Sequence, residues 1–188
     1  MKASYQCLDS QKYTKDVFSL VPIRWEDRYK IMQWRNEQMY HLRQDKLLTK
    51  EDQDAYFENT VSKLFGQEQP EQILFSLLKE DTCVGYGGLV HIDWDLKTAE
   101  ISFIMDTKFE SEGFDFYWQN FLSLIETIGF QKIEMIKLYT YAYDIRPNLF
   151  ILIENLGYEN EKILKKHVLI EGQLRDVIIH RKFNSRRV

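Results

Sequence analysis

Cysteine, proline and glycine are all scarce in this chain of 188 residues. It holds two cysteines, three prolines and eight glycines. So few prolines and glycines exclude a collagen-like or linker-dominated protein. Cys7 and Cys83 belong to no Cys-x-x-Cys or mixed Cys/His cluster, which argues against a disulfide framework or a resident metal. We therefore expect a reduced, cytoplasmic protein without a metal cofactor.

Long apolar runs and an excess of basic charge are also missing. The longest uninterrupted apolar run, residues 149–153, is far too short to span a membrane. The N-terminus lacks the apolar centre of a signal peptide. Because 25 Lys and Arg face 29 Asp and Glu, the net charge is −4, and no global basic field attracts nucleic acid or anionic lipid. We expect a small-molecule partner, no nucleic acid and no membrane, and we leave a homodimer open.

The chain does contain enough apolar surface for one good-sized core. Hydrophobic residues make up 44% and aromatic residues 14%, which suits one globular domain of this length. No internal repeat or composition break marks a linker. We expect a single domain over residues 18–183, after a polar N-terminal arm at 1–17 and before a basic tail at 184–188.

Hydrophobic periodicity predicts the order of the elements. Strands are expected at 18–24, 73–79, 83–92, 99–105 and 133–142, and at 167–170 and 174–180 as a hairpin. Helices are expected at 26–36, from an N-cap at Thr49 with Asp52 as its capping-box partner, from Tyr117 to a stop at Gly129, and at 147–155. This order predicts an α+β fold with a mixed, mostly antiparallel central sheet flanked by helices and ending in a β-hairpin.

That element order resembles the GCN5-related N-acetyltransferase (GNAT) superfamily over residues 18–183. Residues 24–27 with 34–36 resemble the opening of the branch of ribosomal-protein and amino-sugar N-acetyltransferases. Glu100 within its strand is similar to an acidic residue of the family pattern, and residues 152–158 resemble the ending of the family's short helix. Residues 144–147 and the late hairpin with Asp176 resemble the subgroup associated with sugars of surface polysaccharides.

The resemblance implies that acetyl-CoA lies where strands 99–105 and 133–142 splay apart. Splaying leaves backbone N–H and C=O groups without partners, and the pantetheine amides can supply them. The next helix directs its N-terminus at the pyrophosphate. Arg146 stands where many relatives have an asparagine that contacts CoA. The cofactor-binding candidates are Phe103, Ile104, Met105, Ser111, Gly113, Phe114 and Arg146.

The phosphate loop at residues 108–115 departs from the family pattern. Gly113 is the one residue that clearly survives from it, and Glu110, Glu112 and Asp115 crowd negative charge into the same place. Carboxylates stabilise a helix N-terminus, but they repel a phosphate. Two interpretations stay open: a variant cradle whose carboxylates turn outward, or an acid-capped helix in a GNAT-shaped binding domain that has lost CoA.

Direct acetyl transfer to an amine requires a base, because an ammonium has no lone pair. Glu100 is the first candidate, since the resemblance places it on the strand that carries acetyl-CoA; the alternative role is a salt-bridged strand residue. Many relatives use a tyrosine as the acid where this chain has Ile153, so Tyr143 or Tyr141 becomes the candidate acid. His91 and Asp93, at the end of the preceding strand, are further candidate bases, and His91 is also a substrate-binding candidate.

The first helix and its following bend shape the acceptor pocket in relatives. Trp34, Arg35 and Arg43 lie there, and an arginine can hold a nucleotide-sugar diphosphate. The leading hypothesis is therefore an acetyl-CoA-dependent N-acetyltransferase that acts on a primary amine, preferably of a nucleotide-linked amino sugar. The alternatives are the N-terminal amine of a protein, or no catalysis at all.

Overall fold

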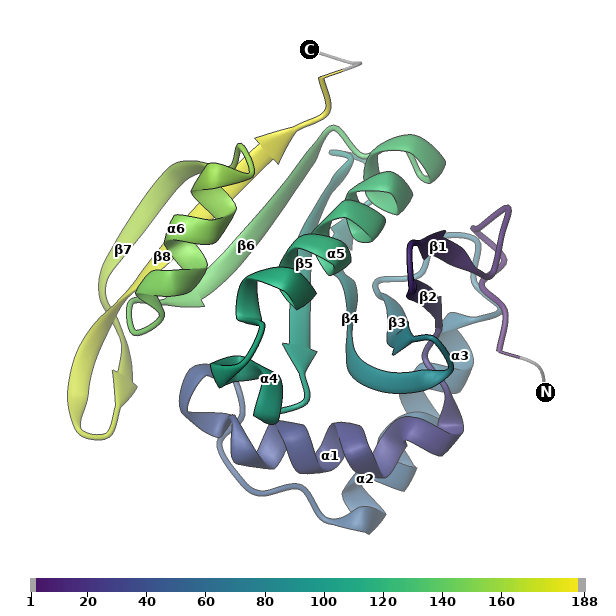
Figure 1. The fold of residues 1–188 in the computed structure, drawn as a ribbon, viewed down its shortest axis with the longest axis horizontal. Helices are drawn as coiled ribbons and strands as arrows, with labels where there is room; N and C mark the ends of the chain where they lie inside the picture. Colours follow the sequence, from purple (N-terminus) through teal and green to yellow (C-terminus); the bar gives the residue numbers. More distant parts are fainter. Residues whose placement is uncertain (1–2, 186–188) are drawn as a thin grey trace.

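One sheet of eight strands runs through residues 3–185, the part of the chain described by this computed structural model (Figure 1). The strands are β1 (Tyr13–Lys15), β2 (Phe18–Pro22), β3 (Ile73–Lys79), β4 (Thr82–Asp93), β5 (Thr98–Met105), β6 (Lys137–Tyr143), β7 (Glu159–Ile170) and β8 (Gln173–Phe183). They lie in the order β1-β2-β3-β4-β5-β6-β8-β7. Neighbouring strands are antiparallel except β5 and β6, which are parallel.

Helices flank this sheet. They are α1 (Arg28–Glu37), α2 (Lys50–Tyr56), α3 (Ser62–Leu64), α4 (Lys108–Ser111), α5 (Phe114–Glu126) and α6 (Pro147–Asn155). Two 3₁₀-helices, η1 (Trp25–Asp27) and η2 (Met39–His41), and two π-helical segments, η3 (Phe57–Val61) and η4 (Thr127–Lys132), complete the helical elements of residues 3–185. Figure 1 shows α5 crossing β4 and β5, and α6 lying over β7 and β8. The predicted fold class is confirmed, including the C-terminal hairpin.

Local sequence signals explain several boundaries. The predicted capping box begins α2: the Thr49 hydroxyl accepts from the Asp52 amide at 3.1 Å, and the Asp52 carboxylate accepts from the Thr49 amide at 3.0 Å. Two N–H groups that the helix leaves unpaired are thereby satisfied. Pro147 begins α6 at the first helical position, as expected for a residue that lacks an N–H.

The predicted helix stop at Gly129 is wrong. The helical chain continues past Gly129 through η4 to Lys132, and β6 begins only at Lys137. A Cβ atom at Gly129 would lie 2.9 Å from Leu138 Cδ1. This glycine therefore permits close packing of η4 against β6, and it ends no helix.

Both ends of the described chain contact the sheet or its connections. β1 pairs with β2 and closes one edge. Tyr5 is 1% exposed, and its hydroxyl donates to the Leu74 carbonyl and accepts from the Leu74 amide. Asn184 donates to the carbonyls of Phe130 and Met135, and the rest of the predicted basic tail, at 186–188, lies outside the described residues. No helix of the described residues has the length and apolarity needed to span a membrane.

The sheet opens between β5 and β6. Their parallel pairing covers three positions, from Thr98↔Lys137 to Glu100↔Tyr139. β5 continues to Met105 beside β4, while β6 continues to Tyr143 beside β8. The two strands therefore diverge after Glu100, which agrees with the splaying that the family resemblance implied.

Candidate active site

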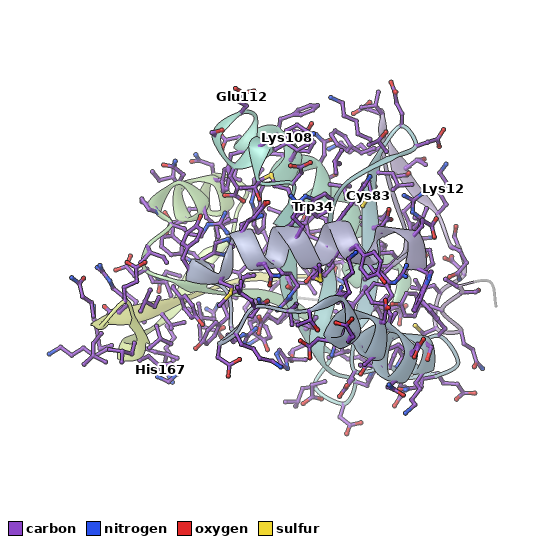
Figure 2. The ribbon with its side chains drawn as sticks, turned by 90° about the horizontal axis from the view of Figure 1, so that it is seen from below. Lys12, Trp34, Cys83, Lys108, Glu112 and His167 are labelled. Atoms are coloured by element: carbon purple, nitrogen blue, oxygen red, sulfur yellow. The ribbon has the colours of Figure 1, made fainter. Side chains whose placement is uncertain are left out.

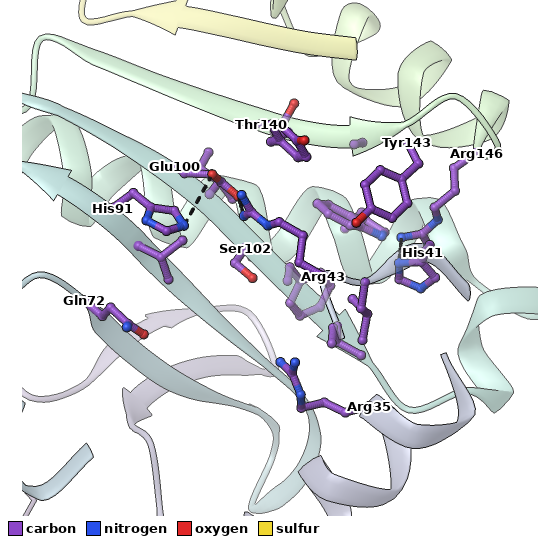
Figure 3. A pocket seen from close by; sticks show the side chains of 18 residues that line it. Arg35, His41, Arg43, Gln72, His91, Glu100, Ser102, Thr140, Tyr143 and Arg146 are labelled. Atoms are coloured by element: carbon purple, nitrogen blue, oxygen red, sulfur yellow. Dashed lines mark hydrogen bonds and ion pairs between the residues drawn. The ribbon is translucent and has the colours of Figure 1, made fainter. Parts of the chain in front are cut away.

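A cavity of about 480 Å³ occupies the opening between β5 and β6 (Figure 3). Residues of both strands line it, together with side chains from the bend after α1 and from the loop before α6. Side chains alternate along β5, so Glu100, Ser102 and Ile104 share one face. Phe103 faces the other side, where its ring stacks on Phe121 of α5 at 4.0 Å between centroids.

Glu100 lies at one end of this cavity and is 4% exposed. Arg43 donates to one of its carboxylate oxygens, and His91 Nε2 lies 3.9 Å from the other. Figure 3 shows these three side chains together. Burial raises the pKa of the Glu100 carboxyl, while the charge of Arg43 opposes the rise. A buried carboxylate with a raised pKa is suited to accept a proton from an amine.

A β-bulge brings His91 to this end of the cavity. The register of β4 against β5 shifts between Val90↔Glu100 and Asp93↔Thr98, and His91 adopts a positive φ of 48° inside that shift. An extra residue in one strand re-aims the neighbouring side chains. The sequence offered no clear signal for this bulge, because residues 83–92 predicted one regular strand.

Arginines dominate the charge of the cavity. Arg35, Arg43 and Arg146 all line it, and Glu100 is the one acidic residue among the described lining residues. The Arg43 guanidinium also lies over the Tyr141 ring at 4.6 Å. Arg35 donates from Nη1 to the Tyr86 hydroxyl at 2.6 Å and from Nε to Gln44 Oε1 at 2.9 Å.

Arg146 connects the cavity with the predicted phosphate loop. Its Nη2 donates to Glu110 Oε2 at 2.6 Å, and its guanidinium lies 5.5 Å from the centre of the Phe114 ring. Gly113 precedes α5 with a positive φ of 94°, a conformation that favours glycine. Ser111, Gly113 and Phe114, which were predicted to bind the cofactor, do not line the cavity.

Tyr143 lies toward the other end of the cavity from Glu100, near Arg146 and His41 (Figure 3). It is 8% exposed, and burial raises the pKa of its hydroxyl. A protonated phenol at neutral pH can donate a proton to a leaving group. Ile153, where many relatives have the tyrosine, is fully buried in the core.

Two further predicted site residues, besides those of the phosphate loop, do not line the cavity. Trp34, labelled in Figure 2, projects from α1 into the core and is 4% exposed. An indole on the inner face of an amphipathic helix buries a large apolar area, which explains its place. Met105 is fully buried, and its carbonyl accepts a hydrogen bond from Gln38 Nε2 at 2.8 Å.

Among the lining residues that the sequence analysis did not predict, Trp118 and Thr140 carry polar atoms of special interest. Trp118 Nε1 and Thr140 Oγ1 are buried polar atoms that find no hydrogen-bond partner within residues 3–185, and both residues line the cavity. Buried polar groups without partners are rare in folded proteins. Together with the diverging strands, they fit a ligand with amide groups such as the pantetheine arm of acetyl-CoA. Because Trp118 follows the apolar stripe of its helix, the sequence pattern predicted only a core residue at that position.

Comparisons with known proteins agree with this architecture. A family model described as the acetyltransferase (GNAT) domain matches residues 20–179. A crystal structure of spermidine N-acetyltransferase from Vibrio cholerae with CoA and spermine is similar at a TM-score of 0.79 and 17% identity, covering 91% of this chain and 98% of that chain. A dodecameric structure of the enzyme from the same organism gives a TM-score of 0.72, 17% identity, and coverage of 93% and 98%. No curated protein matches.

At 17% identity these structures support the fold alone. The assignment of the chain to a family rests on the family model, which spans most of the chain. Among residues 3–185, no cluster of three or more His, Cys, Asp or Glu side chains is placed to hold a metal ion. The chain belongs to the GNAT acetyltransferase family, and it is an acetyl-CoA-dependent N-acetyltransferase of that type.

Proposed function

We propose that this enzyme acetylates the primary amine of an acceptor that also carries an anionic group, preferably a nucleotide-linked amino sugar. One observation carries the proposal: three arginines and a single carboxylate line the same cavity. Arginine is well suited to phosphate because its planar fork of donors matches the phosphate oxygens. The family assignment itself leaves the acceptor open.

Arg35 is the residue best placed to bind the acceptor's anion. Its two hydrogen bonds go to neutral oxygens, on Tyr86 and Gln44, and no carboxylate of the described residues forms an ion pair with it. Its charge is therefore available to a ligand. Arg43 differs, because its charge is shared with Glu100.

A polyamine fits this lining less well. Such an acceptor carries several positive charges, and each charge beyond the reacting amine would face arginines in a partly buried cavity. Like charges at close range repel more strongly there than in water. The similar spermidine acetyltransferases therefore do not determine the acceptor of this chain.

The residues of the cavity divide the chemistry between them. Glu100 accepts the proton of the acceptor's ammonium group. Arg43 and His91 hold the Glu100 carboxylate in place. Tyr143 supplies the proton that the leaving thiolate needs. Acetyl-CoA supplies the activated acyl group. The pantetheine arm of acetyl-CoA is bound by the backbone of Phe103 and Ile104 and by the side chains of Thr140 and Trp118. The phosphates of acetyl-CoA are bound by Arg146 and by the loop of Ser111, Gly113 and Phe114.

The test is an acceptor comparison with purified enzyme and acetyl-CoA, measured as thiol release. The matched acceptors are a UDP-linked amino sugar, the same amino sugar without the nucleotide, spermidine, and a peptide with a free N-terminus. We expect the highest kcat/KM for the UDP-linked sugar. Arg35→Gln should raise its KM roughly tenfold, as expected for one charged hydrogen bond, and should change the free sugar little. Higher kcat/KM for spermidine, or an equal effect of Arg35→Gln on both sugars, would overturn the proposal.

A further inference from the structure

A chain of hydrogen bonds connects Arg146 with the buried end of β5. Arg146 Nη1 lies 3.3 Å from His41 Nδ1, and His41 Nε2 lies 3.3 Å from Gln38 Oε1. Gln38, which is 1% exposed, then donates from Nε2 to the Met105 carbonyl at 2.8 Å. The sequence analysis predicted no role for His41 or Gln38.

The direction of this chain follows from the chemistry of its members. A guanidinium has only donors, so His41 Nδ1 must accept and the imidazole proton must lie on Nε2. That proton is then donated to Gln38 Oε1, which leaves the Gln38 amide nitrogen free to donate to Met105. Each of these three contacts therefore joins a donor to an acceptor, and the arrangement holds the ring of His41 in one tautomer and orientation.

His41 also leaves the charge of Arg146 intact. Burial and the neighbouring Arg146 charge lower the pKa of His41 to about 3, so the imidazole is neutral at neutral pH. Glu110, on the other terminal nitrogen of Arg146, is instead an ionised partner. The guanidinium thus has one neutral contact that orients it and one anionic contact that neutralises it.

We propose that His41, supported by Gln38, is a positioning residue that holds the Arg146 guanidinium at the cavity for a phosphate of acetyl-CoA, with Glu110 as the partner that the phosphate replaces. The inference rests on the proposed role of Arg146 in binding the cofactor. Replacing a carboxylate oxygen by a phosphate oxygen on Nη2 preserves a charge-assisted hydrogen bond. The contact from Nη1 to His41 need not change in that exchange.

Calorimetric titration with CoA tests the inference without requiring turnover. His41→Leu should weaken CoA binding roughly tenfold, the effect of losing one hydrogen bond to a charged group, and kcat at saturating acetyl-CoA should stay close to the wild-type value. His41→Gln keeps one acceptor and one donor and should restore most of the affinity. In an Arg146→Ala background, His41→Leu should have no further effect, because interacting residues are not additive.

The matched control is His167→Leu, a histidine exposed on β7, which should bind CoA as the wild type does. Unchanged CoA affinity in His41→Leu, additive losses in the double variant, or no rescue by His41→Gln would each overturn the inference. An unchanged affinity in Arg146→Ala would remove its premise as well. Failure of the acceptor proposal is distinguishable, because it would appear as tight CoA binding without acetylation of the anionic amines.

Discussion

Neutralising Glu110 should tighten CoA binding, although this residue lies in the loop expected to bind the phosphates. In the structure its carboxylate is bonded to Arg146 at 2.6 Å, and the two side chains are 19% and 10% exposed. A phosphate that binds Arg146 must first displace this carboxylate. Glu110→Gln removes the competing charge and preserves the shape of the side chain.

The magnitude follows from the geometry of that pair. A hydrogen bond to a charged group contributes about 1.5–3 kcal/mol, against about 0.5–1.5 kcal/mol for a neutral one. The substitution should therefore relieve about 1 kcal/mol of competition. Loss of the repulsion between a carboxylate and a nearby phosphate adds a further ~1 kcal/mol at this partly exposed place. Since about 1.4 kcal/mol is tenfold, we expect binding roughly 5- to 30-fold tighter.

Calorimetric titration of CoA measures this directly, and the chain provides a matched control. Glu112 lies two residues away, is exposed, and projects at the outer rim of the molecule in Figure 2. Glu112→Gln should change the affinity by less than about twofold, because exposed charges are strongly screened. Weaker binding in Glu110→Gln would refute the reasoning and would show that Glu110 holds Arg146 in its binding position. Equal effects of the two substitutions would point to a general charge effect.

Four further substitutions test the chemistry and the core. Glu100→Gln should lower kcat by about 10²- to 10⁴-fold, as expected for loss of a general base. The wild-type rate should fall as the pH decreases through the raised pKa of Glu100, because the protonated acid cannot accept a proton. Arg43→Gln should move this fall in rate to higher pH, because the charge of Arg43 opposes the rise of that pKa. Tyr143→Phe should lower kcat at least tenfold with little change in the KM of the acceptor, and a kcat equal to wild type would exclude Tyr143 as the acid. Phe121→Ala should destabilise the fold by about 3–5 kcal/mol in urea unfolding, since the fully buried ring stacks on Phe103.

The fold was predictable where one residue pattern dominated. Strand 73–79 carries an apolar run, and helix 147–155 has a proline at its start and Gly157 after its end, so β3 and α6 match their predicted bounds. β7 was predicted at 167–170 only, whereas it begins at Glu159. Its first eight residues are mostly charged and exposed on both faces, so no alternation between apolar and polar residues marks them as a strand.

The candidate site was predictable to the extent that the family resemblance located the strands. Glu100, Arg35, Arg43 and His91 line one cavity, and their catalytic and binding roles stay predictions. The contacts of Arg146 could not be predicted, because His41 is a lone histidine in an irregular bend and Glu110 belongs to a loop with three carboxylates. Which of these acidic side chains turns inward depends on tertiary packing, which no local pattern encodes.

The most direct test of this account is the calorimetric titration of acetyl-CoA into the wild type and into Ala142→Trp, with ATP as a control ligand. Ala142 lines the cavity on β6, so an indole at that position should fill the opening between the strands. We predict specific micromolar binding with one site per chain in the wild type and its loss in Ala142→Trp. No binding at millimolar acetyl-CoA, or equal binding by the variant, would contradict the assignment of this opening as the acetyl-CoA site.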